Sequence, residues 1–363
     1  MLAAPLQQVD RTCVRHGRRT LAYFGGCDYF RLASHPEVLR ALHEGAEKYG
    51  LNVAASRKTT GNHVLFEQLE KKLATFFGVE RAALLSNGYA TNLAFTQSFA
   101  GEFTHALLDG RAHGSLRDAA LLLGCPMEEF RHRDTKDFAR ALKKLGPRAR
   151  PLVMTDGMFS HDGSLAPLQE YLAALPRAGR LLVDDTHGAG TLGACGRGTP
   201  EVCGVQDERM IQTITLSKAF GVYGGAVLGP ERVIEAIQER SRLFTGNTPP
   251  PLPLVNAALA SVRILKTDPT LRARLVAKVA ACKATLVRNG WRSPMLETLS
   301  PIIAVVPRNS RHASQLKRAL LRAGVFPSLI SYSGGPPYFR FALSSEHTAA
   351  QLDALVQTLI ANP

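Results

Sequence analysis

The feature that most constrains the fold is an alternation of short apolar runs with segments of helical periodicity through the middle of the chain. The apolar runs predict strands at residues 82–86, 105–109, 151–157, 180–185, 211–217 and 224–229. The periodic segments predict helices that include 63–78, 91–100 and 115–124. Strands that alternate with helices are typical of an α/β domain, in which helices cover both faces of a largely parallel sheet.

The proline-rich run TPPPLP, at 248–253, ends this alternation. Beyond it the pattern predicts a long helical region at 254–289, strands at 301–307, 325–332 and 338–343, and a final helix from Thr348. A chain of 363 residues can bury more than one core. We therefore expect an N-terminal segment at 1–34, a large domain at 35–247 and a smaller α+β domain at 248–363.

Composition and cysteine spacing limit the classes of protein to which the chain can belong. Hydrophobic residues make up 45% of the chain and charged residues 20%, as in ordinary globular proteins. No apolar stretch is long enough to span a bilayer, and the N-terminus lacks the charged-then-apolar order of a secretory signal. The six cysteines show no C-x-x-C pair and no zinc-finger spacing. We therefore expect a cytoplasmic protein with reduced thiols and no metal site.

The net charge of +14 suggests an anionic partner, either nucleic acid or a phosphate-rich small molecule. The densest basic stretch is 130–151, and apolar residues recur with helical spacing in its core at 134–145. This pattern favours a solvated helix with a basic outer face. Aromatic residues are not interleaved as a base-stacking surface requires, so we expect no nucleic acid partner.

Polar residues follow the predicted strands at the points where they end. In open α/β sheets, ligands bind beyond the carboxyl ends of the strands, so these residues should converge on one edge. They are Ser86 to Tyr89, Asp109 and His113, Asp156 and Ser160, Asp184 and His187, and Lys218.

Pyridoxal 5'-phosphate is a cofactor that needs this set of groups. A lysine amine binds its aldehyde, and a carboxylate keeps its pyridine nitrogen protonated. Backbone N–H groups at a helix N-terminus bind its phosphate. The segment TITLSKAFGVYGG places Lys218 between a β-branched run and a glycine-rich stretch. Taken alone, this lysine could equally be a surface charge at a strand end.

Several motifs occur together and in one order along the chain. They are DYFRLASHPEV, SRKTTGNHVLFEQLEKKLATFFG, SNGYATN, LLDGRAHGS, TDGMFSHDGSLAPL, LLVDDTHGAGTLG, TLSKAFGVYGG and FRFALSSEHT. In these motifs the chain resembles the α-oxoamine synthase family of fold-type-I pyridoxal-phosphate enzymes, from about Asp28 to the C-terminus. The resemblance implies the fold of aspartate aminotransferase, a mostly parallel sheet flanked by helices with a smaller α+β C-terminal domain.

The resemblance assigns catalytic roles to four residues. Lys218 corresponds to the Schiff-base lysine and Asp184 to the partner of the pyridine nitrogen. His113 corresponds to the histidine that stacks on the ring, and His187 to a residue near the phenolic oxygen. Asp185 could be confused with Asp184 from the sequence alone, and the family motif favours the first of the pair. A satisfied core histidine and an exposed loop histidine are the alternatives for His187 and His113.

The resemblance also implies further cofactor contacts. Ser160 corresponds to a hydroxyl near the phenolic oxygen. The phosphate would be held by the backbone amides of Asn87, Gly88 and Tyr89 and by the hydroxyl of Thr215. An ordinary strand-to-helix turn is the alternative for the first three, and a β-branched strand residue for the fourth.

Arg340, in YFRFAL, corresponds to the arginine that binds the carboxylate of the amino-acid substrate, which a guanidinium fork suits. A strand residue with its head at the surface is the alternative. Cys27 stands where the family usually has an asparagine that contacts substrate. Phe30-Arg31 replaces a leucine-glycine pair, LNVAASR replaces a glycine-rich approach to its SR, and the leading helix common in the family is missing. These departures put the substrate, but not the cofactor, in question.

The segment FTGNTPPP resembles a family stretch in which a hydroxyl residue reaches the phosphate of the neighbouring subunit. It therefore implies a homodimer with shared active sites. A proline-rich domain linker is the alternative, and we assign neither Thr245 nor Thr248 to the site.

The resemblance implies a decarboxylating condensation of an amino acid with an acyl-CoA or carrier-bound thioester. We favour L-alanine and a pimeloyl thioester, which give 8-amino-7-oxononanoate for biotin synthesis. Glycine with acetyl-CoA and a palmitoyl transfer to serine are alternatives. Two other classes remain: an aminotransferase on the same fold, and a basic nucleic-acid-binding or regulatory protein. The presence of Lys218, Asp184 and Arg340 argues against the last of these.

Overall fold

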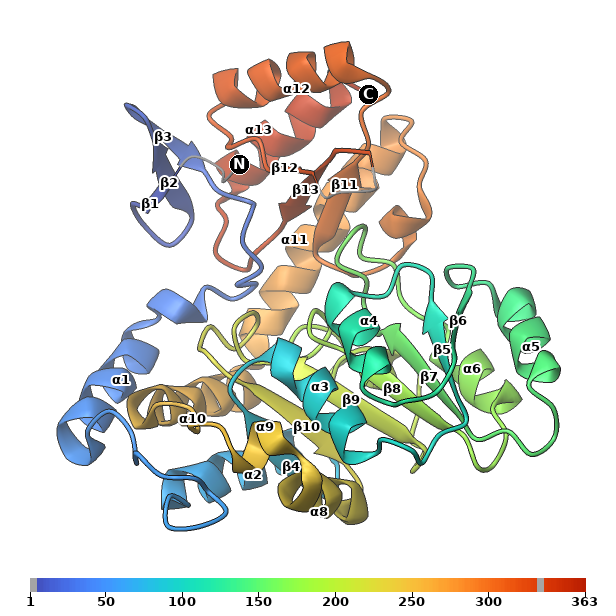
Figure 1. Cartoon of the computed structure of the whole chain (residues 1–363). Helices are drawn as coiled ribbons and strands as arrows, with labels where there is room; N and C mark the ends of the chain where they lie inside the picture. Colours follow the sequence, from blue (N-terminus) through green and yellow to red (C-terminus); the bar gives the residue numbers. More distant parts are fainter. Residues whose placement is uncertain (1–4, 332–335) are drawn as a thin grey trace. The chain divides into compact units, whose positions relative to one another are not determined.

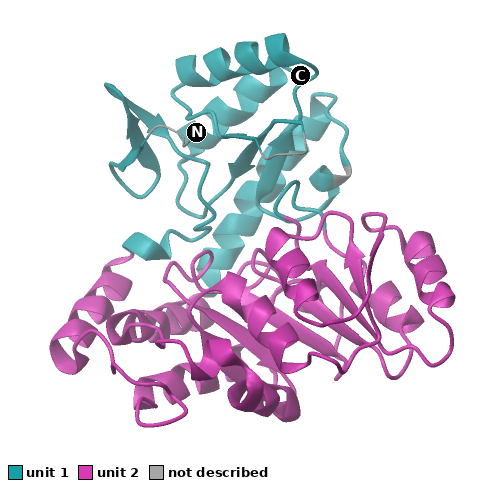
Figure 2. Ribbon diagram, in the orientation of Figure 1, with its two compact units in different colours: residues 1–34, 160–164, 269–363 teal, residues 35–159, 165–268 magenta. Residues whose placement is uncertain are grey.

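The computed structural model covers the whole chain and describes residues 5–331 and 336–363 (Figure 1). The chain forms two compact units (Figure 2). Unit 1 contains residues 1–34, 160–164 and 269–363, and unit 2 contains residues 35–159 and 165–268. The sequence-based boundary at 247 placed the helix that follows it in the small domain, whereas contacts group that helix with unit 2.

Unit 2 is built on a seven-stranded sheet in the order β4-β10-β9-β8-β7-β5-β6. Neighbouring strands run parallel from β9 through β8, β7 and β5 to β6, and β10 runs antiparallel to both β4 and β9. The expected mostly parallel sheet is therefore confirmed. The strands are β4 (Arg81–Leu85), β5 (His105–Asp109), β6 (Met127–Phe130), β7 (Pro151–Asp156), β8 (Arg180–Asp184), β9 (Met210–Thr215) and β10 (Gly225–Gly229).

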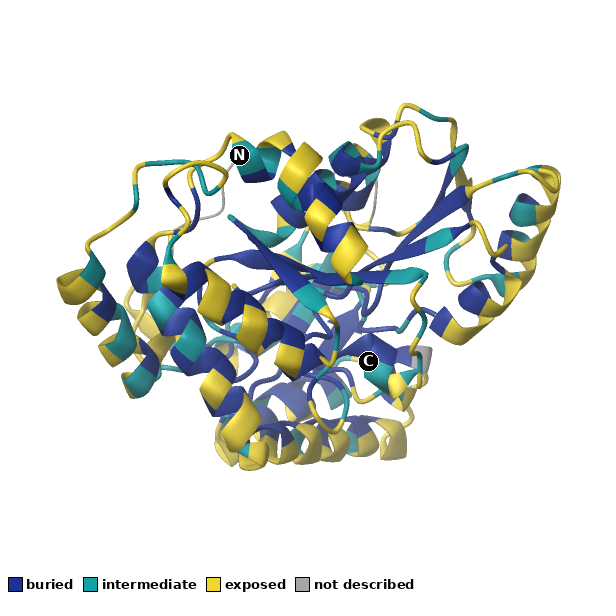
Figure 3. Ribbon diagram, turned by 90° about the horizontal axis from the view of Figure 1, so that it is seen from below, coloured by how far each residue is buried: buried dark blue, intermediate teal, exposed yellow. Residues whose placement is uncertain are grey.

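Helices cover both faces of this sheet. Alternate strand residues point to opposite faces, so Met154 of β7 packs in one hydrophobic cluster and Val153 in another. The first cluster includes residues of α3, α4 and α8, and the second includes residues of α5 and α6. Figure 3 shows the strands mostly buried and the helices exposed on their outer sides. The helices are α1 (Pro36–Tyr49), α2 (Val64–Phe77), α3 (Gly88–Ser98), α4 (Gly114–Leu121), α5 (Thr135–Lys144), α6 (Leu168–Ala174), α7 (Thr199–Val202), α8 (Glu231–Arg240), α9 (Arg242–Thr245) and α10 (Leu252–Thr267).

Unit 1 contains two small antiparallel sheets, ordered β1-β2-β3 and β11-β13-β12. Its last helix begins after Thr348, whose side chain and backbone form a capping box with Gln351, as the sequence predicts. The elements are β1 (Gln7–Gln8), β2 (Cys13–His16), β3 (Arg19–Ala22), η1 (Leu32–Ser34), α11 (Pro269–Arg288), η2 (Pro294–Glu297), β11 (Ile302–Val305), α12 (Ser310–Arg322), β12 (Leu329–Ile330), β13 (Tyr338–Ala342) and α13 (Ala349–Ile360).

The helical region expected at 254–289 is confirmed, and it consists of two helices because Pro269 cannot donate a backbone hydrogen bond and starts a new helix. Two differences from the expected strands concern β12 and β6. The strand expected at 325–332 is reduced to β12, and residue 332 lies outside the described part. The strand β6 was not predicted, because Glu128 and Glu129 interrupt its apolar pattern at the sheet edge.

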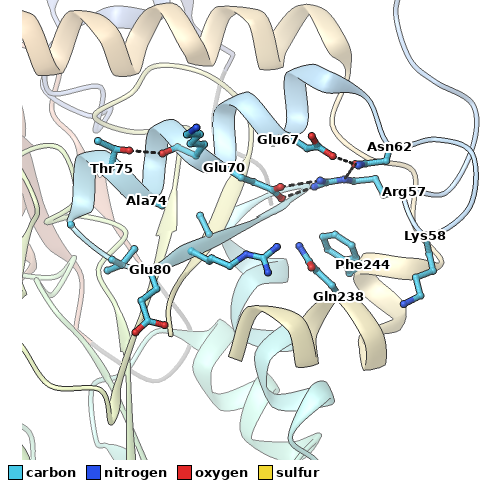
Figure 4. Close-up of a pocket in the computed structure, with 15 residues that line it drawn as sticks. Arg57, Lys58, Asn62, Glu67, Glu70, Ala74, Thr75, Glu80, Gln238 and Phe244 are labelled. Atoms are coloured by element: carbon cyan, nitrogen blue, oxygen red, sulfur yellow. Dashed lines mark hydrogen bonds and ion pairs between the residues drawn. The ribbon is translucent and has the colours of Figure 1, made fainter. Parts of the chain in front are cut away.

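A buried ion pair between Arg57 and Glu70 links α2 to β4 (Figure 4). Both oxygens of Glu70 accept hydrogen bonds from Arg57, at 2.6 and 2.9 Å. Oε1 of Glu70 also accepts the backbone N–H of Leu84 in β4, at 2.8 Å. The Arg57 guanidinium lies 4.9 and 5.0 Å from the ring centroids of Phe66 and Phe244. This pair, in the wall of a cavity of about 910 Å³, fixes the strand that leads into the site described below.

Among residues 5–331 and 336–363, no helix combines the length and the apolar character needed to cross a bilayer.

Removing the acceptor of this pair should destabilise unit 2. In Glu70→Ala the Arg57 charge and the Leu84 N–H both lose their acceptor in a buried setting. We expect the free energy of unfolding to fall by about 3–5 kcal/mol, measured by urea denaturation. Glu67→Ala is the control, because Glu67 lies on the same helix but bonds to the exposed Asn62, at 2.6 Å. Its expected effect is within about 0.5 kcal/mol. Equal losses in the two variants would contradict the assignment.

Candidate active site

The carboxyl ends of the strands in unit 2 surround a cavity of about 230 Å³. β4, β7, β8 and β9 all end at this edge, because β4 and β9 each pair antiparallel with β10 and so run in the same direction. Every residue of unit 2 to which the family resemblance assigns a catalytic or cofactor-binding role lines the cavity. The lining residues are Asn87, Gly88, Tyr89, His113, Ser115, Asp156, Asp184, Thr186, His187, Thr215, Ser217 and Lys218.

The N-terminus of α3 forms an anion cradle in this cavity. Asn87 caps the helix, and its Oδ1 accepts the N–H of Ala90 at 2.9 Å. The first N–H groups of a helix, here those of Gly88 and Tyr89, have no intrahelical acceptors and attract anions. A Cβ on Gly88 would lie 2.8 Å from the Cβ of Thr215, so this close approach requires glycine. The hydroxyl of Thr215 donates to the carbonyl of Gly224 at 3.1 Å. The cradle therefore fits a phosphate group.

Asp184, at the end of β8, presents a carboxylate held by donors on both oxygens. Oδ2 accepts from the amide of Asn92 at 2.7 Å and from the hydroxyl of Ser115 at 3.4 Å. Oδ1 accepts the N–H of Thr186 at 3.2 Å. Sequence reasoning missed Asn92 and Ser115 as positioning residues. The signal for the first was a polar residue inside the quoted motif SNGYATN, on a helix whose neighbouring residues are buried.

Asp185 lies on the other side of the strand and does not line the cavity. It accepts the backbone N–H and hydroxyl of Thr199, at 2.9 and 2.7 Å, and the amide of Gln212 at 2.8 Å. A Cβ on any of three surrounding glycines would overlap its carboxylate; these are Gly157, Gly188 and Gly198. The structure thus separates the two aspartates, with Asp184 in the cavity and Asp185 enclosed in the core.

Asp156 and His113 are joined across the cavity wall. Oδ2 of Asp156 accepts the backbone N–H of His113 at 2.8 Å. Burial raises the pKa of Asp156 well above its ordinary value, and the charge of Asp184 adds to this effect. His113 caps α4, and its Nδ1 accepts the N–H of Ser115 at 3.2 Å. This hydrogen bond fixes which ring nitrogen faces away from the helix.

Lys218 follows β9 in a tight turn. The N–H of Val222 donates to the carbonyl of Leu216, and the N–H of Leu216 donates to the carbonyl of Gly224, each at 2.9 Å. The turn places Lys218 in the cavity wall, partly exposed, whereas His187 is 5% exposed. The amine, the Asp184 carboxylate and the anion cradle thus line one cavity, a donor set that matches the requirements of pyridoxal phosphate.

The remaining predicted residues, Ser160, Arg340 and Cys27, belong to unit 1. Nη1 of Arg340 donates to the carbonyl of Ser160 at 3.3 Å. Cys27 is half-buried and adjoins Tyr29. Asp109, another strand-end residue, is fully buried and does not line the cavity. Its oxygens accept from groups within unit 2, namely the backbone of Arg111 and Arg133 and the ring of His132.

A side chain at the anion cradle should weaken cofactor binding. We expect Gly88→Ala to reduce the affinity for pyridoxal 5'-phosphate by at least about tenfold, because its Cβ displaces Thr215 from the cradle. An absorbance titration of the apoprotein measures this. The matched control is Gly114→Ala, at the first position of α4, where nothing lies within 4 Å of the new Cβ. Unchanged affinity in Gly88→Ala would contradict the placement of the phosphate.

Asp185 should make stability depend on pH. Burial raises its pKa from 3.8 to about 7. The native state therefore keeps a proton between pH 4 and 7 that the unfolded state has released, so stability falls as pH rises through this window. In Asp185→Asn this part of the slope should disappear, whatever the absolute stability of the variant. Urea denaturation at pH 5 and pH 8 measures the difference, and an unchanged slope would contradict the assignment.

Comparisons with known proteins agree with this geometry. The family model for class I and II aminotransferases matches residues 25–359. The 8-amino-7-oxononanoate synthase of Thioalkalivibrio sulfidiphilus is 38% identical over 98% of this chain and 90% of the relative. The enzyme of the same name from Nitrosococcus oceani is 34% identical, over 95% of this chain and 92% of the relative.

Solved structures give the same result. The serine palmitoyltransferase of Sphingomonas wittichii superposes with a TM-score of 0.91 at 27% identity, covering 98% of this chain and 90% of that chain. A serine palmitoyltransferase from S. paucimobilis with bound PLP has a TM-score of 0.90 at 28% identity, with the same coverage. The 8-amino-7-oxononanoate synthase of Francisella tularensis has a TM-score of 0.80 at 25% identity, covering 93% and 96%. The chain therefore belongs to the class I and II aminotransferase family of pyridoxal-phosphate-dependent enzymes, and within it to the α-oxoamine synthases.

Proposed function

We propose that the protein is an acyltransferase that condenses L-alanine with a pimeloyl thioester, with loss of carbon dioxide, to form 8-amino-7-oxononanoate. The observation that carries this proposal is the cavity in which Lys218, Asp184 and the N-terminus of α3 meet. The choice of substrates is supported by curated relatives named 8-amino-7-oxononanoate synthase, which are 34–38% identical over nearly the whole chain.

The residues that would hold the cofactor follow from the donor set. The amides of Gly88 and Tyr89 and the hydroxyl of Thr215 would bind its phosphate, Asp184 would bind its pyridine nitrogen, and Lys218 would bind its aldehyde. When bound, the cofactor supplies an electron sink for the bonds at the substrate α-carbon.

The protein's own residues then bind, orient and move protons. Arg340 binds the α-carboxylate of the amino acid with its planar fork. Once its amine is released, Lys218 removes the proton from the α-carbon and later returns one to the product. His113 would stack on the cofactor ring, and the hydrogen bond from its backbone N–H to Asp156 supports its position.

The remaining site residues have supporting roles in the proposal. His187 and Ser160 act near the phenolic oxygen of the cofactor, and Asn87 supports the phosphate cradle by capping α3. Cys27 lies where the substrate binds.

A second candidate is a transfer of a long acyl chain to L-serine. Structures named serine palmitoyltransferase superpose with TM-scores of 0.90 and 0.91. Their identities of 27–28% are lower than the 34–38% of the curated 8-amino-7-oxononanoate synthases, so we rank this candidate second.

We further propose that the protein acts as a homodimer in the cytoplasm. Large apolar side chains remain exposed on α2 and on the loop before it, with Leu51 70% and Val64 53% exposed, which is consistent with a partner surface. The six cysteines are all unpaired, as a reducing compartment requires.

The proposal is tested by following free thiol when the protein with pyridoxal phosphate is given one amino acid and one acyl-CoA. We expect thiol release with L-alanine and pimeloyl-CoA, and a loss of at least about 10²–10⁴-fold in Lys218→Ala. The control is Lys58→Ala, an exposed lysine outside the cavity. A preference for L-serine with palmitoyl-CoA would favour the second candidate. A keto acid formed without thioester would instead indicate an aminotransferase.

A further inference from the structure

Arg31 occupies a backbone conformation that rarely carries a side chain. Its φ is +54°, in the left-handed region, which is unfavourable for a residue with a Cβ. In the motif that this chain resembles, the position is a glycine, which adopts this conformation freely. Arg31 is also 5% exposed, so this chain holds a guanidinium inside unit 1 where the pattern has no side chain.

Two nitrogens of the Arg31 guanidinium, Nε and Nη2, donate hydrogen bonds, and these bonds orient the third, Nη1, toward Gly26. Nε donates to the hydroxyl of Ser344 at 3.3 Å, and Nη2 donates to the carbonyl of Tyr23 at 2.9 Å. Nη2 also lies 3.4 Å from Nε2 of His347. Nη1 lies 3.9 Å from the point that a Cβ on Gly26 would occupy, and the hydroxyl of Tyr23 lies 3.9 Å from the same point. Two donors therefore converge beside a glycine.

The charge of Arg31 has no carboxylate in contact with it among residues 5–331 and 336–363. Asp28 acts on this charge, but its two oxygens accept hydrogen bonds from the N–H groups of Leu32 and Ala33, each at 3.0 Å. Burial lowers the pKa of Arg31, and it lowers that of His347 to about 3, so the histidine is neutral and Arg31 carries the positive charge of the pair. A desolvated cation in this state is costly and is stabilised by an anion.

Arg340 is another cation whose charge acts on Tyr23. The positive charges of Arg31 and Arg340 both favour the ionised form of the Tyr23 hydroxyl, although burial raises the pKa of Tyr23. Arg340 is already assigned to the α-carboxylate of the amino acid. The pimeloyl thioester of the proposed reaction brings a second carboxylate, at the far end of its acyl chain, and the product keeps it.

We propose that Arg31, together with the hydroxyl of Tyr23, binds the carboxylate at the far end of the acyl chain, so that the enzyme selects dicarboxylic over monocarboxylic acyl thioesters. This inference rests on the proposed function. A guanidinium and a phenol O–H offer the donors that a carboxylate accepts. An acyl chain without that carboxylate would leave a buried cation unpaired, and sites of this kind discriminate strongly against such analogues.

The test compares pimeloyl-CoA with heptanoyl-CoA, which has the same number of carbons and no far carboxylate. We expect wild-type protein to prefer pimeloyl-CoA in kcat/KM. In Arg31→Gly, which suits the backbone conformation, the ratio of the two values should fall about 10- to 100-fold. Arg31→Lys keeps the charge without the planar fork and should retain part of the ratio. The KM for L-alanine should be the same in the Arg31 variants as in the wild-type protein.

The control is Arg11→Ala. Arg11 pairs with Glu346 at 2.9 Å and donates to the carbonyl of Arg31 at 3.1 Å, so it supports the same turn from the exposed side. Its loss should affect both acyl-CoAs alike and leave the ratio unchanged. If Arg31→Gly also lowers both alike, Arg31 is structural and the proposal is wrong. If only the KM for L-alanine rises, Arg31 binds the amino-acid carboxylate instead.

A binding measurement separates this inference from the proposed function. Calorimetric titration of the protein with pimelate and with heptanoate requires no turnover. Tighter binding of pimelate in wild type, lost in Arg31→Gly, would support the site even if no thiol were released. Equal binding of the two acids in wild type would overturn it, even if the condensation itself were demonstrated.

Discussion

The sheet of unit 2 is buried on both faces, and this constraint decides where polar chemistry can lie. All residues of β7 and β10 are buried, so an unpaired polar side chain within these strands would carry a large desolvation cost. The polar side chains buried within β9 have hydrogen-bond partners. The Thr213 hydroxyl donates to Asn92 at 2.6 Å, and the Gln212 amide donates to Asp185. Groups that must meet a ligand are therefore confined to strand ends, where Asp184 and Lys218 line one cavity.

The two consecutive aspartates at the end of β8, Asp184 and Asp185, lie on opposite sides of the strand. Adjacent residues of a strand point to opposite sides, so Asp184 faces the cavity while Asp185 enters the core. The first is held by side chains from α3 and α4, and the second by Thr199, Gln212 and a ring of glycines. Like charges in neighbouring residues are tolerated because each has its own donors and because burial favours a proton on Asp185.

Local pattern predicted much of the fold and of the cavity. The strand at 105–109 was predicted to the residue, and most of the residues that line the cavity in unit 2 were found from strand ends and from family motifs; these include Asn87, Gly88, Tyr89, His113, Asp184, His187, Thr215 and Lys218. Asn92 and Ser115 were missed because their roles depend on contacts with Asp184, 92 and 69 residues away. The sequence showed that Arg31 stands where the family motif has a glycine. It did not show that Arg31 adopts the left-handed backbone conformation that favours glycine.

The short segment at 160–164 belongs to unit 1 although the chain on either side of it belongs to unit 2. The chain therefore passes between the units at 34/35, 159/160, 164/165 and 268/269. Neither unit is a continuous stretch of sequence, so neither can be gained, lost or exchanged by recombination at a single junction. Exchange of either unit as a whole would therefore require joins at more than one of these points.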